Sequence, residues 1–315
     1  MERLVTLVGG SGFVGAAVAE ALARRGIRIR VLSRNPATAN RLRALGDVGQ
    51  IVHVPGDIEI PGTLGPALAG SDAVVNLVGI LDATPAGFDA AHVRGARNVA
   101  EAAAALGVRE LVHVSAIGAD PQSPAAYGRS KAGGEAAVKA AFPAAIIIRP
   151  SVIFGPEDQF TNRFARLLMR SPIMPVIAPD AKLQPVYVGD VAAAIVAILE
   201  RRFEEAEDVA PLWELAGPDI VTMRSLLKLL ADLTERDRTL VDVPEYGARL
   251  LAAASFLPCA PITTDQLEML LRGNVASGQF PGLAELGITP TALAGIARVW
   301  LHHYRPGGRF AASAA

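Results

Sequence analysis

Apolar and polar residues alternate along the chain in two patterns. Short and nearly continuous apolar runs, beginning with residues 4–8, are typical of strands buried on both faces of a parallel sheet. Longer stretches have apolar residues at helical spacing, as in residues 13–25, which end at Gly26. This alternation predicts strand–helix–strand crossovers and therefore a parallel sheet.

Further apolar runs in the first half of the chain predict strands at residues 27–32, 51–54, 73–78 and 110–115. Helices are predicted at residues 88–106 and 127–141. The predicted fold class is therefore α/β, with a Rossmann-type doubly wound parallel sheet.

We predict a dinucleotide-binding domain over residues 1–200 and a smaller C-terminal lobe over residues 201–315. No repeat or low-complexity linker marks a boundary, so the lobe is expected to be interleaved with the core. A helix near residues 265–272 is expected to contribute mainly to the core of this lobe. Four leucines are also expected to pack it: Leu226, Leu227, Leu229 and Leu230.

Composition and charge narrow the class of protein. The 315 residues carry a net charge of −1, which argues against a nucleic-acid binder because such proteins have a basic surplus. Cys259 is the one cysteine, so the chain has no internal disulfide and no cysteine-based zinc site. A reducing, cytoplasmic compartment is the simplest location, and no metal is expected.

The ends of the chain and its apolar stretches bear on membrane association. The N-terminus enters a strand at once, without the pattern of a signal peptide. The uncharged run at residues 250–264 contains Pro258 and Pro261 and is shorter than the roughly 20 residues of a membrane-spanning helix. We expect it to lie in the core, with a membrane surface as the alternative.

A glycine-rich turn follows the first strand. Gly9, Gly12 and Gly15 stand three residues apart where the strand gives way to the helix. Glycines allow a sharp turn and a close approach of the backbone to a pyrophosphate, and the beginning of a helix attracts the anion. This arrangement predicts a dinucleotide site, with a merely tight turn as the alternative.

The end of the second strand bears on the choice of cofactor. A carboxylate about 20 residues after the glycines holds the ribose of NAD(H), whereas an arginine accommodates the 2′-phosphate of NADP(H). This chain has Ser33 and Arg34 at that position. The sequence therefore favours NADP(H), with NAD(H) as the alternative if Arg34 is an ordinary solvated side chain.

Other strand ends contribute candidates at the same edge of the sheet. Asp57 and the backbone of residues 77–79 are expected to flank adenine and ribose, although Asp57 could equally cap the following turn. His113 lies in an apolar run, and we interpret it as a core residue and not as a catalyst or metal ligand.

Tyr127 and Lys131 form the candidate catalytic pair. Residues four apart lie on one face of a helix, so the phenol and the ammonium group can face the same cleft. A nearby cation lowers the pKa of a tyrosine and produces a group that can move a proton to or from a carbonyl. The alternative is a chance pair on a solvated helix.

These motifs together resemble the short-chain dehydrogenase/reductase superfamily in its extended and atypical branches. Further matches lie at Gly56–Asp57 and at residues 149–156 and 184–192. The resemblance implies that Tyr127 donates the proton, that Lys131 binds the nicotinamide ribose, and that the nicotinamide end contacts Pro150, Ser151 and Ile153.

This chain departs from the superfamily pattern after the fifth strand. Extended members commonly place a Ser-Ser or Ser-Thr pair there to hold the substrate carbonyl, whereas this chain has Ser115 followed by Ala116. Ser115 is therefore the candidate hydroxyl. The segment from Ser115 to Tyr127 is also shorter than in sugar-nucleotide epimerases, which disfavours a nucleotide-sugar substrate.

The second half of the chain is similar to the accessory subunit of respiratory complex I that has this fold, and to its alphaproteobacterial relatives. The matching segments are residues 144–150, 156–164, 184–188, 262–266 and 282–288. The resemblance implies tightly bound NADPH, a peripheral position near the membrane, and a structural or regulatory role. Because Tyr127 and Lys131 are present, reduction of a hydrophobic carbonyl or quinone is the alternative function, and a redox-sensing binding protein is a third.

The C-terminal tail suggests a partner. Residues 286–315 contain no acidic residue but include three arginines and several aromatic or imidazole side chains: Arg298, Arg305 and Arg309 with Trp300, His302, His303, Tyr304 and Phe310. Such a segment suits an anionic lipid surface or an acidic protein face, possible docking sites on complex I or the inner membrane. The alternative is a solvated basic end with Trp300 packed inward.

The predicted catalytic residues are therefore Tyr127, Lys131 and Ser115. The predicted cofactor-binding residues are Gly9, Ser11, Gly12, Phe13, Val14, Gly15, Ser33, Arg34, Asn35, Asp57, Ile58, Leu77, Val78, Gly79, Ser115, Tyr127, Lys131, Pro150, Ser151 and Ile153.

Overall fold

A computed structural model describes residues 3–204, 209–253 and 262–308. Cys259, Arg309 and Phe310 lie outside the described residues, as does the middle of the uncharged run. The chain forms two compact units. The sheet unit consists of Met1–Pro150, Val188–Leu215 and Ser277–Ile288, and the smaller unit consists of Ser151–Tyr187, Ala216–Ala276 and Thr289–Ala315.

In the described part of the sheet unit, seven parallel strands form one sheet in the order β3-β2-β1-β4-β5-β6-β11. The order reverses between β1 and β4, where an open α/β sheet usually binds its ligand. The predicted doubly wound sheet is therefore confirmed. The strands are β1 Leu4–Val8, β2 Arg28–Ser33, β3 Ile51–Pro55, β4 Ala73–Asn76, β5 Glu110–Val114, β6 Ile146–Pro150 and β11 Leu212–Leu215.

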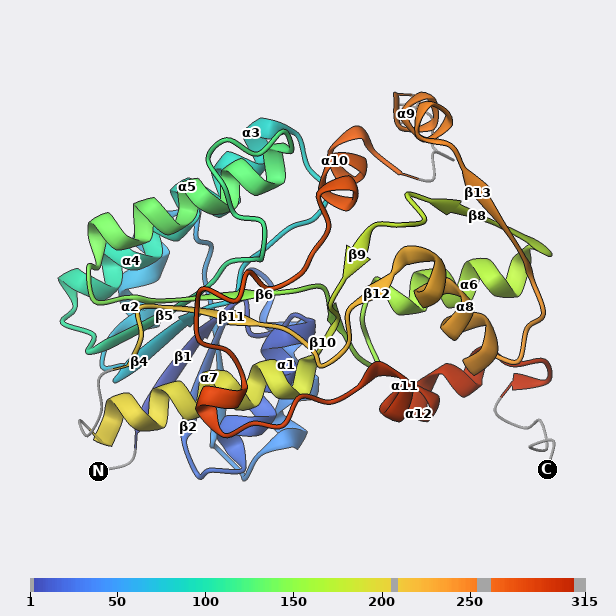
Figure 1. The fold of residues 1–315 in the computed structure, drawn as a ribbon. Coiled ribbons are helices and arrows are strands. Elements are labelled where there is room, and N and C mark those ends of the chain that lie inside the picture. The colour runs from blue at the N-terminus through green and yellow to red at the C-terminus, as the bar shows by residue number, and fades with distance from the viewer. Residues whose placement is uncertain (1–2, 205–208, 254–261, 309–315) are drawn as a thin grey trace. The chain divides into compact units, whose positions relative to one another are not determined.

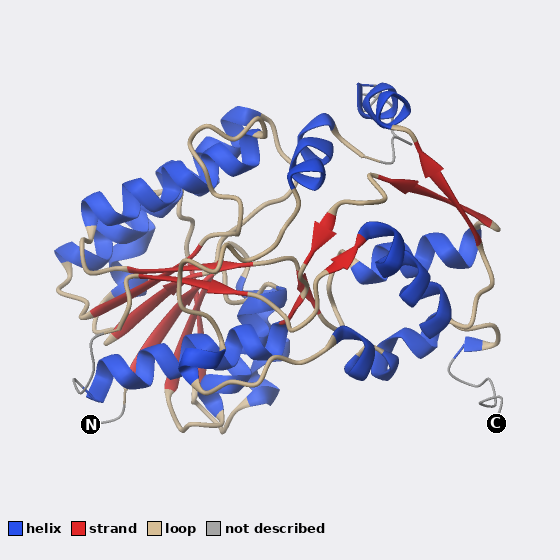
Figure 2. Ribbon diagram, viewed as in Figure 1, coloured by secondary structure: helices blue, strands red, loops and turns tan. Residues whose placement is uncertain are grey.

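Helices cover both faces of this sheet (Figures 1 and 2). On one face lie α1 (Phe13–Ala23) and α7 (Val188–Glu204), and the other is covered by α2 (Leu64–Leu68), α4 (Gly95–Ala105) and α5 (Ala126–Ala141). The central strands β4 and β5 are buried along their whole length because side chains of both layers pack against them, whereas the edge strand β3 is buried only at Ile51.

The predicted helix at residues 88–106 is divided in the structure. A short α3 (Pro85–Phe88) leads into a π-helical segment, η3 (Asp89–Arg94), and then into α4. This segment lies very close to α5, since a Cβ atom added to Gly134 would be 2.2 Å from the carbonyl oxygen of His92. The periodicity of apolar residues does not reveal such a widened turn.

The connections of the sheet unit include two 3₁₀ segments that follow strands, one of 10 residues and one of 3. These are η1 (Pro36–Leu45), which comes after β2, and η2 (Pro61–Thr63), which comes after β3. A third, η4 (Ala284–Leu286), belongs to the C-terminal part of this unit.

The smaller unit contains three strand pairs among its described residues. Strand β7 (Ile153–Phe154) pairs with β10 (Val186–Tyr187), and β9 (Lys182–Leu183) pairs with β12 (Val221–Thr222). The longest pair is formed by β8 (Ile173–Ile177) and β13 (Thr239–Val243). The helices of this unit are α6 Thr161–Arg170, α8 Met223–Leu233, α9 Glu245–Ala253, α10 Thr264–Arg272, α11 Leu293–Ile296, α12 Arg298–Leu301 and the 3₁₀ segment η5 His302–Tyr304.

The core of the smaller unit follows the sequence predictions. Leu226, Leu227 and Leu230 are buried with partly buried Leu229 packed against them, as predicted. Trp300 is also buried and stacks on Phe154 with ring centroids 6.4 Å apart. The inward-packed alternative for Trp300 is therefore what the structure shows. The predicted division of roles between the two parts of the chain stays a prediction.

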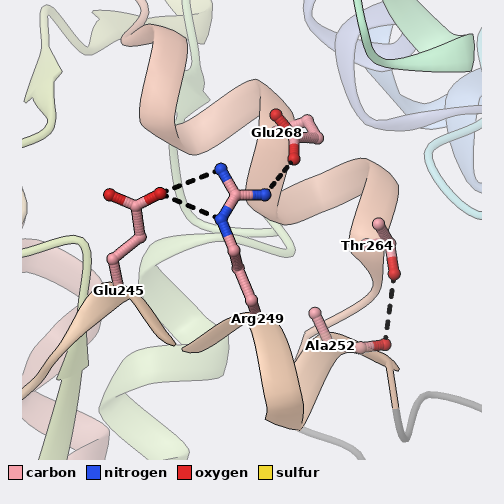
Figure 3. Close-up of polar contacts among 5 residues, drawn as sticks. All are labelled: Glu245, Arg249, Ala252, Thr264 and Glu268. Atoms are coloured by element: carbon pink, nitrogen blue, oxygen red, sulfur yellow. Dashed lines mark hydrogen bonds and ion pairs between the residues drawn. The ribbon is translucent and has the colours of Figure 1, made fainter. Parts of the chain in front are cut away.

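Helices α9 and α10 form a small packed pair (Figure 3). The guanidinium of Arg249 bonds Glu245 at 2.9 Å and Glu268 at 2.7 Å, and Thr264 Oγ1 donates to the carbonyl of Ala252 at 3.3 Å. Leu267 is buried between the helices, as predicted for this stretch. In the described part of the chain, no helix is both long enough and apolar enough to cross a bilayer.

The glycine turn between β1 and α1 is closely packed at Gly9 and Gly15. A Cβ atom on Gly15 would lie 2.5 Å from the Cα atom of Gly10, and Gly9 has a φ of +80°, which disfavours other residues. The backbone closes the turn with a bond from the N–H of Gly12 to the carbonyl of Gly9 at 3.1 Å.

We therefore expect Gly15→Ala to lower the free energy of unfolding by about 2 kcal/mol or more through overpacking. Gly65→Ala is the matched control, because Gly65 is also helical but has nothing within 4 Å of its Cβ position. That control should be neutral or slightly stabilising, since alanine favours helices. Urea denaturation of both variants measures the difference, and equal stabilities would contradict the close packing.

Candidate functional site

The candidate site lies at the carboxyl edge of the sheet, next to the switch point of the strand order. The glycine turn and the segment after β4 meet there, because a Cβ atom on Gly9 would lie 3.0 Å from Cγ2 of Val78. Gly12 precedes α1 without a side-chain cap, so the N–H groups of the first turn have no side-chain acceptor from that position. Gly12 is exposed, and Ser11, Phe13 and Val14 are half-buried around the turn. This cradle fits a dinucleotide pyrophosphate.

The end of β2 offers cations and no carboxylate. Ser33 Oγ donates to the carbonyl of Asn35 at 3.1 Å, and the Asn35 side chain accepts from the N–H of Ala37 and caps the next turn. Arg34 is exposed, and within the described residues its guanidinium makes no hydrogen bond or ion pair. Residues 27–46 contain no acidic side chain. This region suits a phosphate better than a ribose hydroxyl that needs a carboxylate partner.

Asp57 and Ile58 follow β3 and have local roles. The Asp57 carboxylate accepts from the N–H of Glu59 at 2.9 Å, so the turn-capping alternative is realised. Ile58 is buried, and its Cδ1 atom lies where a Cβ on Gly95 would come within 2.4 Å. The side chain of Ile58 therefore belongs to the core, and the predicted cofactor contacts of both residues stay predictions.

Lys131 is brought to the centre of the site. Its Nζ donates to the carbonyl of Val114 at 3.0 Å, at the end of β5, and lies 3.7 Å from the position of a Cβ on Gly79. The side chain is almost completely buried. Burial lowers the pKa of Lys131 to about 8, although the carboxylate of Glu135 acts in the opposite direction.

Tyr127 is half-buried one helical turn before Lys131. Burial raises the pKa of its phenol to about 12, so the expected lowering by the lysine is wrong for this structure. The effect of desolvation outweighs the effect of the neighbouring cation. A phenol that stays protonated at neutral pH is a proton donor, which is the role that the sequence resemblance implies.

Ser115 is buried at the end of β5, and its backbone N–H donates to the carbonyl of Ile148 at 2.7 Å. Its Oγ has no hydrogen-bond partner among the described residues. An unpaired buried hydroxyl costs free energy unless a ligand pairs with it. Ser115 therefore fits the task of holding a substrate oxygen, although Ala116 cannot supply a second hydroxyl.

The predicted contacts at the nicotinamide end lie in different parts of the chain. Pro150 is the last residue of β6 in the sheet unit, whereas Ser151 and Ile153 belong to the smaller unit. Ser151 Oγ donates to the carbonyl of Gln184 at 2.5 Å. The roles of all three in cofactor binding stay predictions.

Sequence reasoning missed His92, which lies in η3. Its Nε2 accepts from the N–H of Ile80 at 3.0 Å, and its Nδ1 bonds Ser130 Oγ at 2.8 Å. The ring also meets the ring of Tyr127 edge-on, with centroids 5.5 Å apart. No spacing in the sequence relates residue 92 to residue 127, because the contact arises where η3 packs against α5.

Sequence reasoning also missed Glu135, one turn after Lys131. Its carboxylate receives two bonds from Arg149 on β6, at 2.8 and 2.6 Å. Glu214 on β11 lies directly across from Arg149 in the strand register, and both acids raise the pKa of Arg149. Buried charges of alternating sign thus run from α5 to the edge of the sheet.

His113 is buried, as expected for a core residue. Its Nδ1 lies 3.2 Å from the side-chain amide of Asn76. Among the described residues, no cluster of three or more His, Cys, Asp or Glu side chains could hold a metal ion. The chemistry that this arrangement supports is proton donation beside a bound dinucleotide.

The chain matches a family model described as the NAD dependent epimerase/dehydratase family over residues 5–210. A similar curated protein is NADH dehydrogenase [ubiquinone] 1 alpha subcomplex subunit 9, mitochondrial, from Rattus norvegicus. It is 32% identical over 298 residues, which cover 92% of this chain and 77% of the relative. The protein of the same name from Arabidopsis thaliana is 30% identical over 319 residues, which cover 97% of this chain and 79% of that relative.

A ceramide reductase from Caulobacter vibrioides is 37% identical over 195 residues, which are 62% of this chain and 60% of that protein. Among solved structures, UDP-glucose 4-epimerase from Thermotoga maritima matches with a TM-score of 0.73 and 16% identity, covering 96% of this chain and 98% of that one. The enzyme WbmH from Bordetella bronchiseptica, in complex with NAD+, matches with a TM-score of 0.64 and 18% identity, covering 77% and 86%. At these identities the structural likeness concerns the fold.

The Glu135–Arg149 pair generates a stability prediction. Glu135→Gln removes the carboxylate that makes two hydrogen bonds to the half-buried guanidinium of Arg149, leaving only the weaker influence of Glu214, and should lower the free energy of unfolding by about 2 kcal/mol. The control is Glu20→Gln, which breaks the exposed pair between Glu20 and Arg24 and should change little. Chemical denaturation compares the two, and a stable Glu135→Gln protein would show that the buried pair contributes little.

Proposed function

The chain belongs to the NAD dependent epimerase/dehydratase family, and on this basis we propose that it is an NADP(H)-binding accessory or assembly subunit of respiratory complex I. The observation that carries the proposal is the extent of the match to relatives named as complex I subunits. It covers more than nine-tenths of this chain, including residues of both units. Its position at the cytoplasmic face of the inner membrane follows from this association.

NADP(H) is the cofactor that the residues favour. The glycine cradle holds the pyrophosphate, and Arg34 is exposed without a partner among the described residues, at the end of β2. No carboxylate between residues 27 and 46 is available to bind the 2′-hydroxyl of NAD(H). Lys131 is placed to bind the nicotinamide ribose.

In this role the cofactor stabilises the fold and the docked state. A ligand that binds only the folded protein adds to its stability by mass action. The glycine turn, the segment after β4 and α5 would all contact one molecule of NADP(H), so its binding ties together the carboxyl edge of the sheet. Such a structural role does not require the subunit to catalyse a reaction.

A second candidate function is the reduction of a hydrophobic carbonyl or quinone. The unpartnered hydroxyl of Ser115 and the protonated phenol of Tyr127 favour it, and so does the likeness to a ceramide reductase. When bound, NADPH supplies the hydride. Ser115 would donate a hydrogen bond to the carbonyl oxygen, and Tyr127 would give that oxygen its proton.

The cofactor proposal predicts that Arg34→Ala weakens NADPH binding about 10- to 100-fold, because a charged hydrogen bond to phosphate contributes roughly 1.5–3 kcal/mol. NADH affinity should be unchanged. Arg24→Ala, at the other end of α1 in an exposed pair with Glu20, is the control. Fluorescence titration with both nucleotides measures the ratio, and equal losses for NADPH and NADH would count against a 2′-phosphate contact.

The two candidate functions differ in what copurifies and in what is consumed. If the protein is an accessory subunit, a pull-down with it from detergent-solubilised native membranes should recover complex I subunits. The purified protein should also retain NADPH without oxidising it when carbonyl and quinone compounds are added. A reductase should oxidise NADPH, and Tyr127→Phe should lower that rate by at least 100-fold without loss of NADPH affinity. No recovered complex I subunits, together with Tyr127-dependent turnover, would reject the first proposal.

A further inference from the structure

Two buried histidines hold the segment after β4 through hydrogen bonds, one directly and one through Asn76. His92 accepts the backbone N–H of Ile80 directly at 3.0 Å. His113 acts through Asn76, whose amide nitrogen lies 3.2 Å from Nδ1 of the ring and whose amide oxygen accepts the N–H of Val78 at 3.2 Å. Both rings are about 2% exposed. Residues 77–80, the cofactor loop, therefore depend on two imidazoles as hydrogen-bond acceptors.

The neighbours of each ring determine where its proton lies. Ser130 Oγ donates to the carbonyl of Tyr127 at 2.8 Å, so it can only accept from Nδ1–H of His92. The Nε2 atom of His92 is then bare and free to accept from Ile80. A second proton on this ring would be on Nε2. Nε2–H would then face the N–H of Ile80, and the hydrogen bond between them would be lost.

The same reasoning gives His113 the opposite tautomer. Because the amide oxygen of Asn76 accepts from Val78, its NH₂ group faces the ring and donates to Nδ1. His113 therefore carries its proton on Nε2. Protonation at Nδ1 would bring two donors together and would break the path from the ring to Val78.

His92 also reaches the other half of the candidate site. Through Ser130 it fixes the carbonyl of Tyr127, and its ring lies edge-on to the phenol while stacking on Phe88 at 5.5 Å. The cofactor loop in turn lies against Lys131, at the 3.7 Å approach to Gly79. One imidazole thus connects the cofactor loop with the first turn of α5.

We propose that His92 is a positioning residue that, in its neutral form, holds the cofactor loop and Tyr127 in register for dinucleotide binding, with His113 supporting the same loop through Asn76. This inference rests on the proposed binding of NADP(H). It goes beyond that proposal because it assigns the geometry of the site to residues that would not contact the cofactor's phosphates.

The surroundings keep both rings uncharged. The titratable groups near them are Tyr127 and Lys131 on α5 and the rings themselves, while Asp89 and Arg94 on η3 pair with each other. Burial and the charge of Lys131 lower the pKa of His92 and of His113 to about 3. The unfolded chain takes up these protons near pH 6.5, so the tethers should be intact above that pH and should lose stability as the pH falls towards 3.

Substitutions at His92 test the proposal in the full chain. His92→Phe keeps an aromatic ring against Phe88 and Tyr127 but removes both hydrogen bonds. We expect at least 10-fold weaker NADPH binding, together with faster hydrogen exchange in a peptide that contains Ile80. His92→Gln, whose amide offers an acceptor and a donor, should restore part of both properties. His53→Phe is the control, because the His53 ring nitrogens make no hydrogen bond among the described residues.

Ser130→Ala provides a second route if His92→Phe does not fold. It removes the acceptor of Nδ1–H, so the ring can adopt the tautomer that cannot accept from Ile80, and exchange at Ile80 should again accelerate. Unchanged NADPH affinity and unchanged exchange in both variants would overturn the inference. If the wild-type protein binds no dinucleotide, the proposed function fails, and exchange at Ile80 still decides whether His92 holds the loop.

Discussion

The buried ammonium group of Lys131 is the constraint around which the carboxyl edge of the sheet is arranged. A charge of this kind is costly unless hydrogen bonds and opposite charges compensate for its loss of water. The carbonyl oxygen of Val114 accepts a hydrogen bond from Nζ of Lys131 at 3.0 Å, and Glu135 supplies a carboxylate one helical turn away. Arg149 then balances Glu135, and the nearby imidazoles of His92 and His113 stay neutral. The hydrogen bond to Val114, the Glu135–Arg149 pair and the neutral imidazoles all accompany one buried cation at the place where a dinucleotide would bind.

Much of the fold could be predicted from the sequence because it depends on local signals. Apolar runs identified the strands, and the spacing of Gly9, Gly12 and Gly15 identified the turn, which is too tight for a side chain at Gly9 and Gly15. The spacing of Tyr127 and Lys131 placed them on one helix. These signals can be read from the sequence because strand and helix periodicities depend on residues that are close together in the chain.

The features that escaped prediction depend on packing between elements. His92 and Glu135 gain their roles only where η3 and β6 meet α5, and no fixed spacing encodes such contacts. The direction of the Tyr127 pKa shift was missed for the same reason, because the depth of burial is a property of the folded chain. The points at which the chain passes from one unit to the other are likewise not marked in the composition.

The last strand of the sheet has a consequence for synthesis of the protein. Strand β11 pairs with β6, with Leu212 opposite Ile147, yet the first segment of the smaller unit, Ser151–Tyr187, and helix α7 are translated between them. A nascent chain therefore carries β6, with its row of isoleucines, as an open edge until β11 has left the ribosome. Such long-range pairing is slow, and an uncovered apolar edge invites pairing with other chains. The β6 edge is therefore an aggregation hazard during synthesis until β11 pairs with it.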